Sequence, residues 1–201
     1  MSNPAAPAFA RGTEILWDSY GVPHINATSL RGVGYGFGWA QAHNHGDLLL
    51  RLYGQARGRA AEYWGGSANL AEDRWVRTIG GVAIGQRGYA ALKPEYRAYL
   101  EAFAAGINDY ARVHADRIAD SVRVVLPVTG ADVMSHSARV LYSFFLSGRQ
   151  RATETGTRWS ERGSNAWAIA PSRSASGKAM LIQNPHLPWG DVFTWMEAQL
   201  T

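Results

Sequence analysis

The sequence predicts an α+β fold, and two patterns support that prediction. Apolar residues recur at spacings of three and four between Tyr96 and Tyr110, as they do along one face of a helix. Short apolar or alternating runs at residues 13–25 and 164–182 are typical of strands. Hydrophobic residues make up 46% of the chain, including 8 Trp and 9 Tyr, so we expect a packed core over most of it.

The first strands are expected at residues 13–18 and 22–25, joined through the turn residues Ser19, Tyr20 and Gly21. His24 lies in the second of these runs. No second metal ligand or acid stands at a useful spacing from it, so we expect a hydrogen-bonded structural histidine there.

A long helix is predicted from Ser29, a plausible N-cap, to about Trp64. Its alternating glycines fail the dinucleotide-binding pattern, because Trp39 stands where that pattern needs glycine or alanine. Close helix packing through Gly34 and Gly38 explains them better. Residues 74–88 contain several glycines and are predicted to form a surface loop.

The second half of the helical region begins at Pro94, a favoured first residue of a helix. Residues 122–126 are rich in valine and predict a short strand or extended link. Thr129 and Asp132 resemble a capping box for a helix that continues through Phe145. Residues 148–162 then lose all periodicity, which is typical of an excisable linker.

A second hairpin is predicted after this linker. In residues 164–170, alanines alternate with Trp167 and Ile169, which indicates a buried strand. Turn residues follow at 172–178, and the apolar run at 179–182 leads back towards the start of the first strand. The hairpin should therefore return His186 to the level of Ser164.

Ser164 lacks the sequence context of the common serine hydrolases. The nucleophile elbow needs glycine two residues to either side, where this chain has Arg162 and Ala166, and no Ser-x-x-Lys pattern occurs nearby. Another activation is available if the Gly163–Ser164 bond is cut. Ser164 would then carry a free α-amino group, with a pKa of about 7.7 to 8.0, as the base for its own hydroxyl.

Three segments together resemble the penicillin acylase family of N-terminal nucleophile hydrolases, in particular its acyl-homoserine lactone acylase and aculeacin acylase branch. They are Gly-Ser-Asn-Ala at residues 163–166, Asn-Pro-His-Leu-Pro-Trp at residues 184–189, and Trp-Asp-Ser-Tyr-Gly-Val-Pro-His-Ile at residues 17–25. Their order and spacing match the family, and the resemblance covers nearly the whole chain. In that family a precursor cuts itself before the serine into two subunits.

The resemblance implies part of an αββα fold, with a helix-rich first subunit and the opening strands of the second. We accordingly expect a disordered N-terminus at residues 1–12, the first subunit at 13–147, a spacer at 148–163 and the start of the second subunit at 164–201. The family's second subunit is long, so the chain is expected to be a fragment of a zymogen that matures into a heterodimer. It should be inactive by itself, because the family's oxyanion-hole residues lie further along.

The resemblance also assigns site residues. Ser164 would be the nucleophile and its α-amino group the base, with cleavage after Gly163, while His186 would orient the amino group. The acyl pocket would be lined by apolar and aromatic residues, although plain packing explains those on the helix equally well: Leu187, Trp189, Tyr142, Phe144 and Phe145.

The implied reaction is removal of an acyl side chain from an amide, with acyl-homoserine lactones or related N-acyl compounds as substrates and quorum quenching as the role. Removal of the side chain of a penicillin or cephalosporin is the alternative within the same class. A binding or structural fragment without catalysis is the alternative from another class.

Other partners receive little support. The net charge of +4 comes from scattered arginines, and the one local cluster, Arg149, Arg151, Arg158 and Arg162, flanks the predicted cut, so we expect no nucleic acid. No run reaches the roughly 20 apolar residues that span a bilayer.

The chain has no cysteine, and His43 and His45 diverge on a helix, so no metal or cofactor is assigned. Calcium occurs in the family, but no ligands for it can be identified here. The family is usually periplasmic or secreted, although residues 1–10 do not form a signal peptide.

Overall fold

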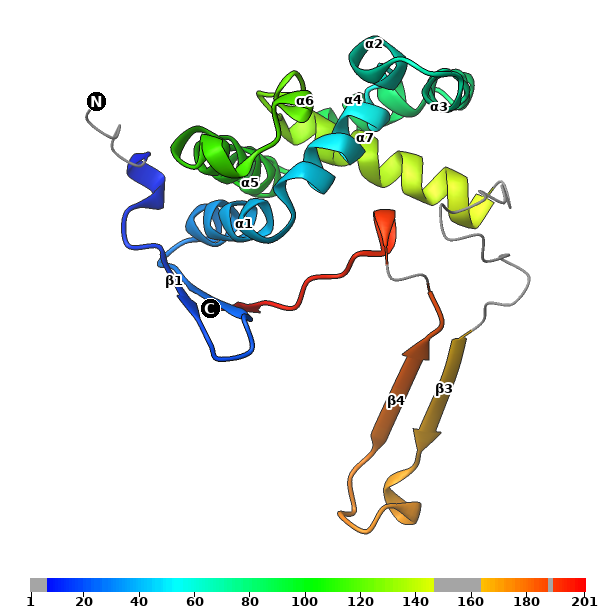
Figure 1. Cartoon of the computed structure of the whole chain (residues 1–201). Helices are drawn as coiled ribbons and strands as arrows, with labels where there is room; N and C mark the ends of the chain where they lie inside the picture. Colours follow the sequence, from blue (N-terminus) through cyan, green and yellow to red (C-terminus); the bar gives the residue numbers. More distant parts are fainter. Residues whose placement is uncertain (1–6, 147–163, 188–189) are drawn as a thin grey trace. The chain divides into compact units, whose positions relative to one another are not determined.

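The computed structural model describes residues 7–146, 164–187 and 190–201. The chain divides into two compact units. The first contains the helices and a small sheet formed from the two ends of the chain, and the second contains a hairpin (Figure 1). Single turns of 3-10 helix lie between the larger elements, at Ala8–Ala10 (η1), Ala115–Arg117 (η2), Pro171–Arg173 (η5) and Asp191–Phe193 (η6).

The sheet of the first unit has the order β1-β2-β5. β1 (Glu14–Trp17) and β2 (Pro23–Asn26) are antiparallel, as predicted, with Leu16 opposite His24. β5 (Gln199–Leu200) runs parallel to β2 on its other edge. Before this sheet, Ala10 of η1 is buried in a cluster with Tyr35 and Ala102.

The predicted long helix is two helices. α1 (Leu30–Ala56) begins at Ser29, whose side chain accepts a hydrogen bond from the backbone of Gly32, so the predicted N-cap is confirmed. The helix ends at Ala56, before Gly58, which has a φ of 62°. α2 (Ala60–Trp64) then follows as a separate helix. The carboxylate of Asp73 accepts hydrogen bonds from the first two backbone amides of α2.

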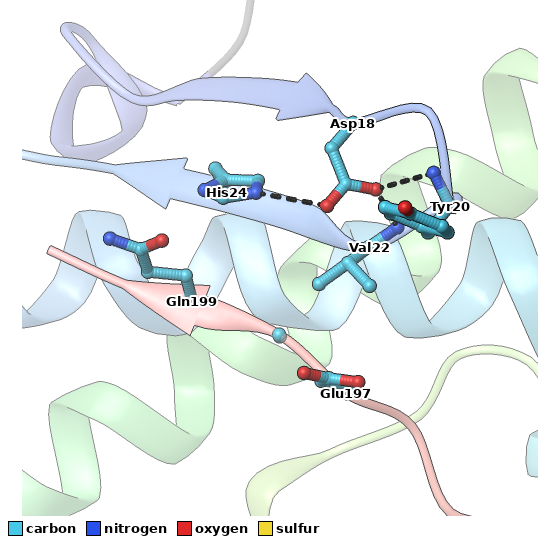
Figure 2. A pocket seen from close by; sticks show the side chains of 7 residues that line it. Asp18, Tyr20, Val22, His24, Glu197 and Gln199 are labelled. Carbon is cyan, nitrogen blue, oxygen red and sulfur yellow. Dashed lines mark hydrogen bonds and ion pairs between the residues drawn. The ribbon is translucent and has the colours of Figure 1, made fainter.

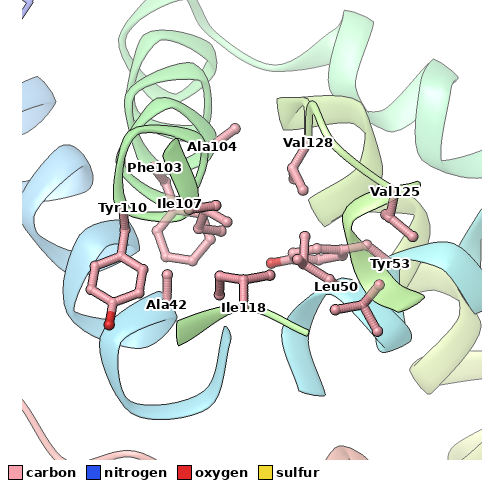
Figure 3. Packing of buried hydrophobic residues seen from close by; sticks show 12 residues of the cluster. Ala42, Leu50, Tyr53, Phe103, Ala104, Ile107, Tyr110, Ile118, Val125 and Val128 are labelled. Carbon is pink, nitrogen blue, oxygen red and sulfur yellow. The ribbon is translucent and has the colours of Figure 1, made fainter. Parts of the chain in front are cut away.

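The core lies where α1 packs on α5 (Pro94–Val113) (Figure 3). A Cβ built on Gly38 would lie 2.0 Å from the carbonyl oxygen of Phe103, and one on Gly106 would lie 2.1 Å from that of Tyr35. Glycine therefore lets the two backbones touch, as expected from the sequence. The predicted stripe on α5 is buried at Phe103, Ile107 and Tyr110 but not at its start, where Tyr96 is exposed.

Two segments form helices where the sequence predicted none. Residues 74–88 were expected to be a loop, but they lie in α3 (Ser67–Thr78) and α4 (Gly81–Ala91). A Cβ on Gly85 would lie 2.5 Å from the backbone nitrogen of Ser135, so that glycine serves packing between helices rather than a turn. Residues 122–126 were expected to be extended, but α6 (Asp120–Arg123) ends there in a turn that buries Val122 and Val125.

α7 (Gly130–Val140) begins with the predicted capping box of Thr129 and Asp132, which is confirmed. The same carboxylate forms a paired contact with Arg57, whose Nε and Nη2 lie 2.7 and 2.8 Å from the two Asp132 oxygens. Arg57 also donates to the carbonyl oxygens of Val125 and Pro127. The α1–α2 corner is thus fixed to the start of α7.

α7 passes without a break into a π-helical segment, Leu141–Leu146 (η3 in the numbering of elements). One hydrogen bond closes more residues in a π turn than in an α turn, and such turns are frequent at functional sites. The sequence predicted a plain helix through Phe145.

The second unit is a two-stranded hairpin of β3 (Ser164–Ile169) and β4 (Met180–Pro185). The strands and their turn agree with the prediction, but the prediction of burial is wrong. Trp167, Leu181 and Ile182 have exposed fractions of 52, 64 and 50%. Along β3 every residue but Ile169 is exposed, and along β4 every residue is exposed.

No helix in the part of the chain that the structure describes combines the length and the hydropathy needed to cross a membrane.

Candidate active site

Ser164 is the first residue of β3, opposite Pro185 in β4, so His186 follows directly after its partner position. The prediction that the hairpin returns His186 to the level of Ser164 is confirmed. The antiparallel register then places Asn165 opposite Asn184. Because strand side chains alternate between faces, these two asparagines share one face, and Ser164 belongs to the other.

His186 is held by the two asparagines. Its Nε2 lies 3.3 Å from the amide nitrogen of Asn165 and 3.0 Å from that of Asn184. An amide nitrogen carries only donors, so Nε2 can accept from both asparagines when the ring proton is on Nδ1. Among the described residues, no hydrogen bond joins Ser164 to His186. Sequence reasoning missed both asparagines as partners of this histidine, although the period of two along each strand points to them.

The start of β3 is exposed, and so is His186. A terminal Ser164 in this position would be accessible to an incoming carbonyl group. Its backbone nitrogen would become the α-amino group after cleavage of the preceding bond. The Nε2 atom of His186 contacts the side-chain amides of both asparagines.

The other predicted site residues are described to different degrees. Leu187 and Tyr142 are both partly buried, in the second and the first unit respectively. Phe144 and Phe145 lie in the π-helical segment, Leu141–Leu146. Gly163, Trp189, the spacer at 148–163 and its arginine cluster lie outside the described residues.

A surface hollow in the first unit brings together His24 and an acid that sequence reasoning did not pair with it (Figure 2). His24 Nε2 lies 3.4 Å from Asp18 Oδ2. Asp18 stands at the β1–β2 turn, and His24 is its diagonal neighbour on the same face. Hydrogen bonds from the backbone amide of Val22 and from that of Tyr20 lower the pKa of Asp18, and His24 adds to this effect. His24 is therefore hydrogen-bonded, as expected, but the statement that no acid lies at a useful spacing was wrong.

In the described ranges, no three His, Asp or Glu side chains lie close enough together to hold a metal ion.

Comparison with known proteins decides the family. The family model described as penicillin amidase matches residues 12–201. The chain belongs to the penicillin amidase family. The resemblance inferred from the three sequence segments is thus confirmed.

Individual similar proteins show how far the likeness extends. The acyl-homoserine lactone acylase PvdQ of Pseudomonas putida is 29% identical over 232 residues, covering 98% of this chain and 30% of that protein. The aculeacin-A acylase of Actinoplanes utahensis is 26% identical over 240 residues, covering 94% of this chain and 30% of that protein. The chain thus spans about a third of the length of these curated relatives.

A solved structure agrees with the penicillin amidase assignment. The thermostable penicillin G acylase of Alcaligenes faecalis matches with a TM-score of 0.58 at 28% identity, over 66% of this chain and 73% of that chain. The predicted fold class is therefore confirmed: the chain is α+β and rich in helices, and it holds part of the penicillin acylase fold.

Proposed function

We propose that the protein is an acylase that hydrolyses the amide bond of N-acyl compounds, with Ser164 as an N-terminal nucleophile. The observation that carries the proposal is the β3–β4 hairpin, in which Ser164 starts a strand and the held imidazole of His186 follows its partner position. Membership of the penicillin amidase family supports it.

Maturation would come first. The Ser164 hydroxyl oxygen attacks the carbonyl carbon of Gly163, and the peptide nitrogen leaves as the new α-amino group, so an ester replaces the amide. Water then hydrolyses that ester to give the Gly163 carboxylate and the free Ser164 hydroxyl. Glycine before the serine suits this step, because the absence of a Cβ lets the backbone bend.

In the mature enzyme the Ser164 α-amino group takes the hydroxyl proton, and the oxygen attacks the substrate carbonyl carbon. The proton passes to the leaving amine as the amide bond breaks, which leaves an acyl ester on Ser164. Water, deprotonated by the same amino group, then releases the carboxylic acid. We assign His186 the task of orienting the amino group, with Asn165 and Asn184 holding its ring.

We infer that the substrates are acyl-homoserine lactones or similar compounds with aliphatic acyl chains, because two of the similar proteins are named as acylases for an acyl-homoserine lactone and for aculeacin A. Hydrolysis of acyl-homoserine lactones would make quorum quenching the role of the protein. Penicillin G is the second candidate, favoured by the structural likeness to a penicillin G acylase. The assignment of five residues to the acyl pocket, made from the family resemblance, stays a prediction: Leu187, Trp189, Tyr142, Phe144 and Phe145.

The test compares Ser164→Ala with Ser172→Ala, a matched substitution at another exposed serine of the same unit. Both are made in the protein expressed from its full reading frame and assayed with N-dodecanoyl-homoserine lactone and with penicillin G. We expect the wild type and Ser172→Ala to release the fatty acid from the lactone faster than phenylacetate from penicillin G. Ser164→Ala should release neither. Equal activity of the two variants would refute the assignment, and a folded wild type without any hydrolysis would favour a binding protein.

A further inference from the structure

The imidazole of His186 has two ring nitrogens, and one of them is already engaged within the hairpin. The side-chain nitrogens of Asn165 and Asn184 lie 3.3 and 3.0 Å from its Nε2. Because an amide nitrogen only donates hydrogen bonds, an Nε2 that accepts from both asparagines carries no proton. A neutral imidazole has one ring proton, which is then on Nδ1. The two contacts therefore favour one tautomer of His186.

The same arrangement leaves Nδ1 as the ring atom that can serve a further partner. Within the described part of the chain, Nδ1 of His186 has no hydrogen-bond partner. The imidazole contacts the asparagines, which share one face of the hairpin, whereas the hydroxyl group of Ser164 belongs to the other face. The backbone nitrogen of Ser164 lies between the two faces, so it is the atom of Ser164 that suits a contact with the imidazole.

We propose that Asn165 and Asn184 are positioning residues for the acylase reaction, because they make His186 a hydrogen-bond donor towards the α-amino group of Ser164. The inference rests on the function proposed above, in which cleavage of the chain exposes that group and His186 orients it. Since Nε2 is engaged by the asparagines, the contact with the amino group goes through Nδ1. Nδ1 carries the ring proton, so His186 donates in this contact and the amino nitrogen accepts.

A hydrogen-bond donor beside an amine changes the protonation equilibrium of that amine. An unprotonated amine has a lone pair that accepts from Nδ1–H, whereas an ammonium group has none, so the contact stabilises the unprotonated form. The unprotonated form is the one that can take the hydroxyl proton of Ser164. When the reaction begins, the hydroxyl group replaces Nδ1–H at this lone pair. The asparagines thus lower the pKa of the α-amino group through His186.

The other charged side chains in the described part of the second unit lie away from Ser164 along the chain. Arg173 and Lys178 belong to the connection between β3 and β4, whereas Ser164 is at the opposite end of β3. Asp191 lies in η6, beyond the end of β4, and forms no ion pair with the described residues. His186 is therefore the titratable side chain that the hairpin brings to the level of Ser164.

The experiment uses the protein expressed from its full reading frame. The double variant Asn165→Leu/Asn184→Leu removes both donors without changing the charge, and folding should survive because both side chains are exposed. Asn44→Leu is the matched control, because this exposed asparagine also contacts a histidine, with its Oδ1 3.0 Å from Nδ1 of His43 in the first unit. Intact mass gives the amount of cleaved protein, to which all rates are normalised.

Solid-state NMR of protein labelled with ¹³C and ¹⁵N at its histidines reports the tautomer directly, in cleaved and uncleaved protein alike. The signals of His186 are those missing from His186→Gln. We expect the proton on Nδ1 in the wild type and in Asn44→Leu, and a protonated Nε2 in the double variant. A wild type with its proton on Nε2, or a double variant with an unchanged tautomer, would overturn the proposal.

The pH dependence of kcat/KM for N-dodecanoyl-homoserine lactone tests the effect on the base. In the double variant the apparent pKa on the acid side of the profile should be about 1 higher than in the wild type, the effect of one hydrogen bond of ordinary strength. kcat/KM should then be up to about tenfold lower on the acid side and converge with the wild type at high pH. Asn44→Leu should follow the wild type.

Two kinetic outcomes would overturn the positioning role: an equal loss in the double variant at every pH, or the same shift in Asn44→Leu. A wild type that hydrolyses no N-acyl compound would refute the proposed function instead. In that case the NMR signals of His186 would still decide whether the asparagines set its tautomer, so the two failures are distinguishable.

Discussion

Gly38 lies where α1 touches α5, and replacing it by alanine tests that contact. The added Cβ would lie 2.0 Å from the carbonyl oxygen of Phe103 and 3.1 Å from its Cα. Real Cβ atoms essentially never come within 3.0 Å of another atom in this way, so the two backbones would have to separate by about 1 Å. Neither atom belongs to a flexible side chain that could turn away.

The size of the effect follows from two opposing terms. Overpacking usually costs about 1 to 3 kcal/mol, and more where the backbone has to shift. Alanine in a helix interior returns about 1 kcal/mol relative to glycine. We expect Gly38→Ala to lower the free energy of unfolding by about 2 kcal/mol, because the clash is with the backbone on both sides.

Gly88→Ala is the matched control. Gly88 also lies in a helix interior, α4, and its added Cβ would meet only the terminal methyl carbon of Met134, at 3.0 Å. That side chain can move, so the variant should be neutral or slightly stabilised. The assay is thermal and urea unfolding followed by far-ultraviolet circular dichroism. If Gly38→Ala were as stable as Gly88→Ala, the close approach of α1 and α5 would be wrong.

Two further predictions concern buried charge. Arg57→Met should lower the free energy of unfolding by about 3 kcal/mol, because Asp132 would remain buried without its paired cation. Arg59→Met, whose partner Glu62 is exposed, should have little effect, and equal losses would contradict this view of Arg57. Burial, and next the charge of Arg139, lowers the pKa of His136 from 6.5 to about 3. Between these pH values the imidazole is therefore neutral in the folded protein and takes up a proton when the protein unfolds. Stability should therefore be intact above about pH 6.5 and decline as the pH falls towards 3, and His136→Gln should flatten that decline in urea titrations. A decline of the same size in His136→Gln would assign it to other groups.

Local signals predicted much of the fold. The N-cap at Ser29, the start of α5 at Pro94 and the capping box at Thr129 all depend on residues within one helical turn, and each was found where the sequence placed it. The β3–β4 register follows from alternation and turn residues in the same way. These features need no knowledge of distant contacts.

Features that depend on distant contacts were predicted poorly. The glycines of residues 80–88 suggested a loop, but Gly85 is needed because the backbone of α7 passes against it at Ser135. The valine-rich run at 122–126 suggested a strand, but burial of Val122 and Val125 in the core favours a helical turn. Neither contact can be read from the nearby sequence.

The candidate site likewise combines features that local sequence predicts with features that depend on distant contacts. Its position on the hairpin followed from the sequence, whereas the partners of its histidine required the paired strands, because Asn165 and His186 are 21 residues apart. The pairing of Asp18 with His24 likewise depends on the β1–β2 register. The predicted burial of the first strand, residues 164–170, was wrong, since an alternating apolar pattern predicts a face that packs but does not say what covers it.

The measurement that tests the central claim most directly is the intact mass and N-terminal sequence of the protein expressed from its full reading frame. Our account predicts a subunit that begins with Ser164, followed by Asn165, Ala166 and Trp167, and no such subunit in Ser164→Ala. An active protein with an intact Gly163–Ser164 bond, or a cut at another position, would contradict it.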